Sequence, residues 1–132
     1  MEQLTVPTNN RTQMVDITRE VQQSVKNANV NNGSVIVFVP HTTAAVTINE
    51  NADPSVQRDI LYELNKVIPF DDSYQHMEGN SAAHIKASLL GSSQTVIVKN
   101  GSLQLGTWQG IYFCEFDGPR KRKAWIQIIQ NA

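Results

Sequence analysis

Three histidines, His41, His76 and His84, are the residues of this sequence best suited to metal binding or acid/base chemistry. Two of them fall in the stretch YQHMEGNSAAH, with Glu78 between them. Three imidazole nitrogens that leave one position open are the ligand set of a catalytic zinc or a related divalent ion. Such a site requires the three side chains to converge. Sequence spacing alone does not show that they do, because no local motif such as HExxH ties them together.

Asn80 and Ser81 precede a helical pattern that contains His84, and this arrangement allows two interpretations. Either residue is suited to cap the helix, whose free N–H groups would bind a phosphate or a carboxylate of a substrate. Alternatively, Ser81 is only a cap, and both histidines of the stretch are polar surface residues.

A single cysteine, Cys114, narrows the choice of metal chemistry. It excludes an internal disulfide and any zinc site built from cysteine pairs, and it fits a reducing compartment. The order H-x-E at His76 is also found in zinc deaminases, but their PCxxC partner is absent, so we exclude that class. Cys114 is a small residue in a predicted strand, and this position is more typical of core filling than of a reactive thiol. Any metal site must therefore use histidines and carboxylates.

The carboxylates differ in how easily a structural role explains them. Asp53 is followed by proline, as is typical of a helix N-cap. Asp59 lies at the margin of an apolar helical face, where a solvated role and a site role fit equally well. Glu50 follows a predicted strand. Glu115 alternates with residues on the expected core side, so it needs a partner: a metal, an arginine such as Arg120, or a substrate amine.

Two further segments offer substrate contacts. GSLQLGTWQG has three glycines around Trp108, but it lacks the GxGxxG and Walker spacings of phosphate loops, so Trp108 fits a packing anchor as well as a stacking platform. The basic run PRKRK is expected at a solvated turn, although Arg120 and Arg122 suit bidentate contacts to phosphates.

Composition sets limits on the fold that positions these side chains. A chain of 132 residues with 40% hydrophobic content is long enough for one domain with a core and too short for two. Its 11 basic and 12 acidic residues nearly cancel, which argues against binding to nucleic acid or to anionic membranes. No signal peptide and no apolar membrane span are recognisable. We therefore expect a single cytoplasmic, soluble domain over residues 1–132.

Strand and helix patterns follow one another along the chain. Two short strands flank a turn at residues 8–11, and an amphipathic helix begins at Asp16 and ends before Gly33. SVIVFV (34–39) predicts a strand buried on both faces, and AAVTIN (44–49) looks like its neighbour in the sheet. Further elements are expected as helices at 54–68 and 83–90, and as strands at 94–100, 110–118 and 121–129. Short connections and an excess of strands favour an α+β domain with a mostly antiparallel sheet or sandwich.

Several motifs, in this order, resemble the YjbQ or UPF0047 family, also called the secondary thiamine-phosphate synthase family. They are HTTAAVTINENADP, Asp59 in VQRD, YQHMEGNSAAHIKASLLG and LGTWQGIYFCEFDGPR. The resemblance runs over essentially the whole chain. It implies a compact β-sandwich flanked by helices, a homotrimer, and a site where the three histidines meet and hold a divalent metal, zinc or magnesium.

The resemblance also implies a weak thiamine-phosphate synthase activity, which joins a pyrimidine methyl diphosphate to a thiazole phosphate and releases pyrophosphate. We therefore expect a metal-assisted enzyme for a small phosphorylated metabolite. The candidate residues are His41, His76 and His84 as metal ligands or acid/base groups, Asp59, Glu50 and Glu115 as supporting carboxylates, and Asn80, Ser81, Trp108, Gln109 and Arg120 on the substrate side. Two alternatives stay open: a metal-dependent hydrolase of such a metabolite, and a non-catalytic trimer that binds a metabolite or metal.

Overall fold

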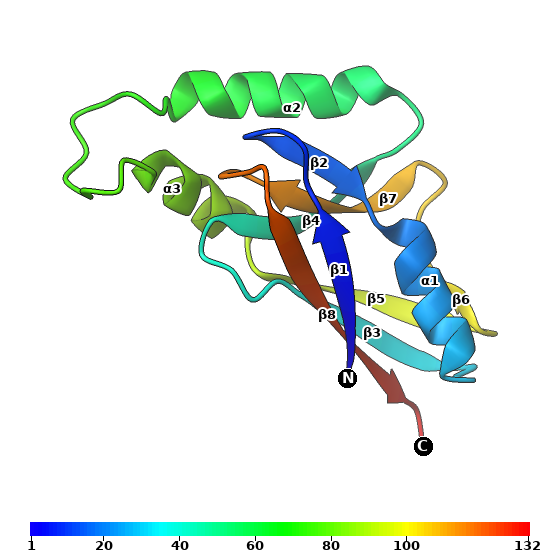
Figure 1. The fold of residues 1–132 in the computed structure, drawn as a ribbon. Helices are drawn as coiled ribbons and strands as arrows, with labels where there is room; N and C mark the ends of the chain where they lie inside the picture. Colours follow the sequence, from blue (N-terminus) through cyan, green and yellow to red (C-terminus); the bar gives the residue numbers. More distant parts are fainter.

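The computed structural model describes residues 1–132, which form two antiparallel β-sheets with three helices around them (Figure 1). The five-stranded sheet has the order β1-β8-β3-β5-β6, and the three-stranded sheet has the order β2-β7-β4. The strands are β1 (Glu2–Pro7), β2 (Gln13–Asp16), β3 (Gly33–Phe38), β4 (Ala44–Glu50), β5 (Ser93–Lys99), β6 (Ser102–Leu103), β7 (Gln109–Glu115) and β8 (Lys121–Gln130). The helices are α1 (Thr18–Asn27), α2 (Pro54–Val67) and α3 (Ser81–Leu90). The predicted α+β class with an antiparallel sandwich is confirmed.

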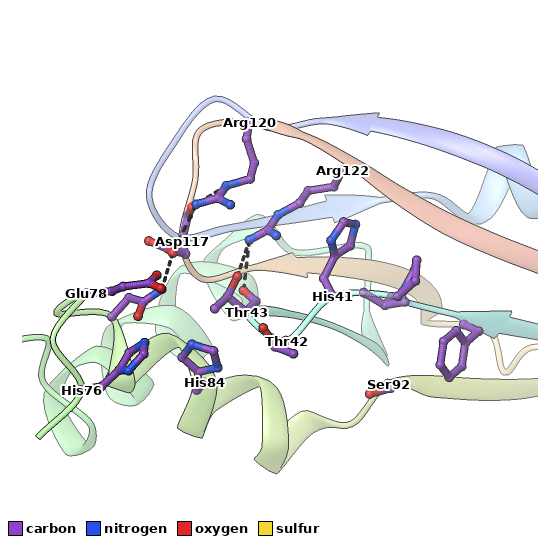
Figure 2. A pocket seen from close by; sticks show the side chains of 14 residues that line it. His41, Thr42, Thr43, His76, Glu78, His84, Ser92, Asp117, Arg120 and Arg122 are labelled. Atoms are coloured by element: carbon purple, nitrogen blue, oxygen red, sulfur yellow. Dashed lines mark hydrogen bonds and ion pairs between the residues drawn. The ribbon is translucent and has the colours of Figure 1, made fainter. Parts of the chain in front are cut away.

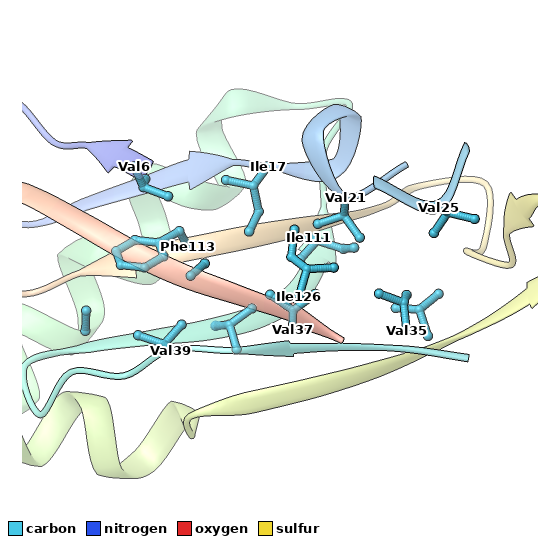
Figure 3. Packing of buried hydrophobic residues seen from close by; sticks show 14 of the residues in the cluster. Val6, Ile17, Val21, Val25, Val35, Val37, Val39, Ile111, Phe113 and Ile126 are labelled. Carbon is cyan, nitrogen blue, oxygen red and sulfur yellow. The ribbon is translucent and has the colours of Figure 1, made fainter. Parts of the chain in front are cut away.

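The main core lies between the inner faces of the two sheets (Figure 3). Val35 and Val37 of β3 point into it from one sheet, and Ile111 and Phe113 of β7 point into it from the other. The spacing of two residues follows from the strand period, which places alternate side chains on the same face. Helix α1 and its N-cap residue add side chains spaced by four residues, as the sequence pattern predicts, and these are Ile17, Val21 and Val25.

A second, smaller core lies between the outer face of the three-stranded sheet and helices α2 and α3. Small side chains of α3, including Ala83 and Ala87, allow the helix to approach β4 closely. Cys114 is fully buried there, and burial raises the pKa of its thiol to about 12. The cysteine is therefore core filling, as the sequence indicates, and not a reactive thiol.

Two sequence predictions about β3 and β4 are wrong. Strand β3 is not buried on both faces, because Val35 and Val37 are buried whereas Phe38 is exposed on the outer face of the five-stranded sheet. Strand β4 is not the neighbour of β3, since β3 pairs with β5 and β8 while β4 pairs with β7 in the other sheet. The short strand β6 was not predicted. Hydrophobic runs show that a segment is extended, but they do not show which sheet it joins.

Three chain segments cross between the sheets at the same end of the sandwich. They connect β1 to β2 (residues 8–12), β3 to β4 (39–43) and β7 to β8 (116–120). Backbone hydrogen bonds join them: Thr8 N–H to the carbonyl of Arg120 at 3.0 Å, and Phe116 N–H to the carbonyl of Thr43 at 3.2 Å. This end therefore brings together segments that are distant in sequence. None of the three helices is long and apolar enough to cross a membrane.

Candidate functional site

A pocket of about 650 Å³ opens where these crossings meet the start of α3 (Figure 2). Its volume is within the range usual for small-molecule sites. Most of its lining is polar, and the lining residues are Phe38, Val39, Pro40, His41, Thr42, Thr43, His76, Glu78, Asn80, His84, Ser92, Asp117, Arg120 and Arg122. The three predicted histidines and the predicted substrate residues Asn80 and Arg120 all belong to this set.

His76 and His84 form a close pair on one side of the pocket (Figure 2). Their ring centroids are 5.4 Å apart, and the ring planes are perpendicular. His84 lies in the first turn of α3, and His76 lies in the loop before that helix. Gly79 shapes this loop because its φ of 76° is in the left-handed region, and its N–H donates to the carbonyl of His76 at 3.1 Å.

His41 approaches the pocket from the other side, just after β3 (Figure 2). Its Nε2 accepts a hydrogen bond from the backbone N–H of Lys123 at 2.9 Å. Burial and the nearby Arg122 guanidinium lower the pKa of His41 from its usual 6.5, so the ring is neutral at neutral pH. With Nε2 as the acceptor, the proton of the neutral ring is on Nδ1. His41 is therefore arranged as a hydrogen-bond donor through Nδ1.

Asp117 connects the two sides of the pocket. Its Oδ2 accepts a hydrogen bond from Asn80 Nδ2 at 2.9 Å and forms an ion pair with an Arg120 terminal nitrogen at 3.2 Å. Arg120 Nε also donates to the Asp117 carbonyl at 3.0 Å. The Arg120 side chain remains half exposed, so part of its guanidinium is available to a ligand. Asn80 Oδ1, in contrast, is buried and has no hydrogen-bond partner.

Arg122 forms the floor of the pocket, and its buried ion pair with Glu115 lies beneath that floor. Arg122 donates to both carboxylate oxygens of Glu115, and it donates to Thr43 Oγ1 at 2.8 Å. Thr8, in the crossing between β1 and β2, donates a hydrogen bond from Oγ1 to the Glu115 carboxylate at 2.7 Å. Burial acts to raise the pKa of Glu115, but these hydrogen bonds outweigh burial and hold it below its usual value. The carboxylate is therefore ionised and fully paired.

Glu115 thus has the buried position expected from the strand pattern, but its partner is Arg122 and not Arg120. Its carboxylate does not line the pocket. The side chain holds the floor together and does not face a substrate.

Five other candidates do not line the pocket. Glu50 and Gln109 are register partners at the far end of β4 and β7, roughly 20 Å from Glu115 along the strands. Trp108 adjoins them and is mostly exposed. Asp59 is exposed on α2, and Ser81 begins α3 beside the pocket without lining it. The structure of this chain therefore does not place these five side chains in the lining of the pocket.

Some lining residues were not identified as candidates from the sequence. Thr43 follows one predicted strand and Asp117 lies at the end of another, and their polar types near His41 and Arg120 were an available signal. Phe38 gave no signal, because in a run of apolar residues it is indistinguishable from a core residue.

One buried charge lies outside the pocket. Lys86 of α3 is fully buried, its Nζ has no hydrogen-bond partner, and this nitrogen lies 3.7 Å from the centroid of the Phe70 ring. Burial, with a smaller effect of the nearby Arg11, lowers the pKa of Lys86 to about 8. Lys86 does not line the pocket, so it is not part of the site itself.

The pocket has donors that suit a divalent metal. Two imidazoles that share one zinc ion, each with its nitrogen about 2 Å from the ion, have ring centres roughly 5 Å apart, and His76 and His84 match this separation. The unpartnered Asn80 Oδ1 and the Glu78 carboxylate add oxygen donors in the same pocket. No three His, Cys, Asp or Glu side chains are grouped closely enough to hold one ion. His41 would join such an ion only by giving up its bond to Lys123.

Comparison with known proteins gives one consistent result. Residues 2–131 match the sequence profile of the family described as UPF0047 protein YjbQ-like. UPF0047 protein YugU of Bacillus subtilis is 51% identical over 130 residues, which cover 98% of each chain.

Solved structures agree with this match. A crystal structure of an uncharacterised conserved YjbQ/UPF0047-family protein from Clostridium acetobutylicum is 57% identical, with a TM-score of 0.97 over 98% of this chain and 100% of that one. A YbjQ-like protein of unknown function from Sulfolobus solfataricus is 34% identical, with a TM-score of 0.94 over 98% of this chain and 96% of that one.

Proposed function

The chain belongs to the YjbQ-like UPF0047 family, and we propose that its pocket binds a small phosphorylated metabolite together with a divalent metal ion. The observation that carries the proposal is the meeting of His76, His84 and Arg120 around one pocket of suitable size. Two imidazoles favour zinc or another transition metal over magnesium, which prefers oxygen ligands. When bound, the ion would act as a Lewis acid toward phosphate oxygens.

The residues of the pocket have distinct tasks in this proposal. Arg120 pairs with a phosphate through the part of its guanidinium that Asp117 leaves free. His41 donates a hydrogen bond from Nδ1 to a phosphate oxygen. Asn80 makes no side-chain cap bond to α3, so the N–H of Ser81, beside the pocket, is not occupied by a cap and is suited to an anion. Asn80 Oδ1 accepts a hydrogen bond from the metabolite or binds the metal.

The reaction that we infer is the one implied by the family resemblance, formation of thiamine phosphate. The ring nitrogen of the thiazole phosphate attacks the methylene carbon of the pyrimidine methyl diphosphate. The new C–N bond forms as the C–O bond breaks, and the electron pair leaves with pyrophosphate. Arg120 and the His41 N–H are suited to stabilise the charge that develops on this leaving group.

Hydrolysis of a phosphorylated metabolite is the second candidate, and Glu78 is the observation that favours it. Its exposed carboxylate lines the pocket with the histidine pair, where it can accept a proton from an attacking water. In this reaction a phosphate ester and water give an alcohol and phosphate, and no second organic substrate is required.

We also propose that the chain assembles as a homotrimer, as the resemblance implies. Helix α2 supports this assembly because it has an apolar face but no buried residue, and Tyr62 and Val67 are more than 60% exposed. Light scattering should then give a mass three times the 14.7 kDa of one chain. A monomeric mass in solution would contradict this part of the proposal.

Product analysis tests the enzymatic proposal. The protein, loaded with zinc, is incubated with both phosphorylated substrates together and with each one alone. Thiamine phosphate and pyrophosphate in equal amounts, formed only when both substrates are present and lost in His84→Ala, are the expected result. Release of phosphate from one substrate alone would favour the hydrolase. No product under either condition, with a folded protein that binds both compounds, would contradict both enzymatic reactions.

A further inference from the structure

The loop between α2 and α3, residues 68–80, carries His76 and Glu78 to the pocket but has few contacts with the rest of the chain. Figure 1 shows that it projects away from both sheets. No hydrogen bond joins residues 69–79 to any residue outside the loop, because the hydrogen bonds of this segment are internal. Other contacts must therefore hold His76 close to His84.

Phe70, near the start of this loop, lies between two cations. Arg11 Cζ is 3.6 Å from the centroid of the Phe70 ring, and Lys86 Nζ is 3.7 Å from it. Both distances are close to van der Waals contact, so the two groups cannot share one face of the ring and must lie on opposite faces. Lys86 is buried and Arg11 is exposed. Because Arg11 belongs to the crossing between β1 and β2 and Lys86 to α3, cation–π contacts tie the loop to two other parts of the molecule.

At its other end the loop is attached through Asn80, whose Nδ2 donates to Asp117 Oδ2 at 2.9 Å. Between the two attachments, residues 71–79 are exposed apart from the half-buried Tyr74. His84, in contrast, belongs to α3, which packs against β4. The separation of the two histidine rings therefore depends on how firmly the loop is attached.

We propose that Phe70 is a positioning residue for the pocket and acts through the loop that carries His76. Its ring, held between Arg11 and Lys86, fixes the path of this loop. The inference rests on the proposed function, because its consequence is a histidine pair that is preformed for a metal ion. Without the ring, the loop would also adopt arrangements in which His76 is far from His84, and the affinity for zinc would fall with the population of the binding arrangement. Phe70 does not line the pocket, so it makes this contribution without touching a ligand.

The test compares Phe70→Leu, which keeps an apolar side chain but removes the aromatic faces, with Phe70→Tyr, which keeps them. Zinc titration should show about tenfold weaker binding in Phe70→Leu and wild-type affinity in Phe70→Tyr. Arg11→Met removes one cation at an exposed position and should weaken zinc binding about threefold. Trp125→Leu is the matched control, because it removes an aromatic ring from β8 that does not line the pocket, and it should leave zinc binding unchanged.

Two measurements on the metal-free protein separate positioning from a general loss of structure. A nuclear Overhauser effect between the rings of His76 and His84 should be present in wild type and in Phe70→Tyr, and it should be lost in Phe70→Leu. The affinity of Phe70→Leu for ethyl phosphate should change by less than about twofold, because Arg120 and His41 belong to other segments of the chain. An equal loss of zinc and ethyl phosphate binding in Phe70→Leu would overturn the positioning role.

The same measurements separate failure of the inference from failure of the proposed function. If wild type binds no zinc, but the Overhauser effect is lost in Phe70→Leu and kept in Phe70→Tyr, the metal site is wrong and the positioning role stands. If wild type binds zinc and Phe70→Leu keeps both the Overhauser effect and the affinity, the positioning role is wrong and the metal site stands. If wild type shows neither, both are wrong. Should thermal melts show that Phe70→Leu does not fold, unchanged zinc affinity in Arg11→Met would overturn the positioning role.

Discussion

The two ends of the three-stranded sheet carry similar residue types but differ in their surroundings. At one end, beyond Ala44 and Glu115, the pocket is lined by histidines and arginines that come from two of the crossings, from the region of the start of α3, and from β8. At the other end, Glu50 pairs in register with Gln109, and Trp108 is exposed beside them. None of the three pockets in the structure is lined by these far-end residues.

The difference between the ends lies in which polar atoms have partners. At the far end, the Glu50 carboxylate accepts the backbone N–H of Ala52 at 3.0 Å, and the Trp108 carbonyl accepts the N–H of Asn51 at 2.8 Å. These contacts complete strand ends and a turn. At the pocket end, Asn80 Oδ1 has no partner and the Arg120 guanidinium is only partly used. Unused hydrogen-bonding capacity, more than residue type, distinguishes a binding site from a structural cluster.

Removing Arg122 should give the largest effect, because the pocket end depends on its buried pair with Glu115. Arg122→Met leaves the Glu115 carboxylate buried without its cation, which should lower the free energy of unfolding by about 3–5 kcal/mol. Chemical denaturation measures this loss. The double variant Arg122→Met/Glu115→Gln should be more stable than Arg122→Met alone, because no unpaired charge remains. Equal stability of wild type and Arg122→Met would show that the Arg122–Glu115 ion pair does not stabilise the pocket end of the sandwich.

Lys86 is a second buried cation, but it belongs to neither end of the sheet and, unlike Arg122, has no carboxylate partner. A shift of its pKa from 10.5 to about 8 corresponds to roughly 3 kcal/mol, of which a cation–π contact with Phe70 offsets about 1 kcal/mol. Lys86→Met should therefore stabilise the protein by about 2 kcal/mol at pH 7.

The pH dependence checks the cause of this gain. Between pH 8 and 10.5 the unfolded chain binds a proton at Lys86 that the folded chain has lost, so wild-type stability rises with pH across this window. The advantage of Lys86→Met should be complete below pH 8 and should disappear as the pH approaches 10.5. An advantage that is independent of pH would attribute the gain to packing.

Arg120 tests whether the pocket end binds anions. Arg120→Ala should weaken binding of ethyl phosphate about tenfold, because it removes a charge-assisted hydrogen bond. Lys66→Ala is a matched control, since Lys66 is an exposed cation on α2 that does not line the pocket. NMR titration of both variants gives the comparison. An equal loss in the two variants would indicate attraction by overall charge and would remove the argument for a site.

Glu50 should give the smallest effect, although the sequence presents it as a supporting carboxylate. Glu50→Gln should change the affinities for zinc and ethyl phosphate by less than about twofold, because roughly 20 Å separate Glu50 from Glu115. The variant is measured in the same titrations. A large loss in the folded variant would mean that the far end completes the site of a neighbouring copy.

Periodicity in the sequence predicted the elements of the fold but not their arrangement. The spacing of Ile17, Val21 and Val25 identified α1 and its buried face, because helix geometry is local. The assignment of β3 and β4 to one sheet failed, since strand pairing depends on contacts distant in sequence, and apolar runs look alike in either sheet.

The sequence predicted the site only in part, because the site also depends on contacts between residues that are distant in sequence. The chemistry of histidine and the family motifs identified His41, His76 and His84 as candidates, and the structure places all three at one pocket. The sequence could not separate Glu115 from a catalytic carboxylate, because its partner Arg122 lies on a different strand in a different sheet. It likewise could not show that Phe38 leaves the core and faces the pocket.

The most direct test of the metal site is elemental analysis of protein purified without a histidine tag and equilibrated with zinc. Wild type, His76→Ala, His84→Ala and Glu50→Gln are measured side by side, with folding verified by thermal melts. We predict a single zinc ion per chain in wild type and in Glu50→Gln, and its loss in both histidine variants. Wild-type protein without zinc, or histidine variants that retain it fully, would contradict a metal site formed by His76 and His84.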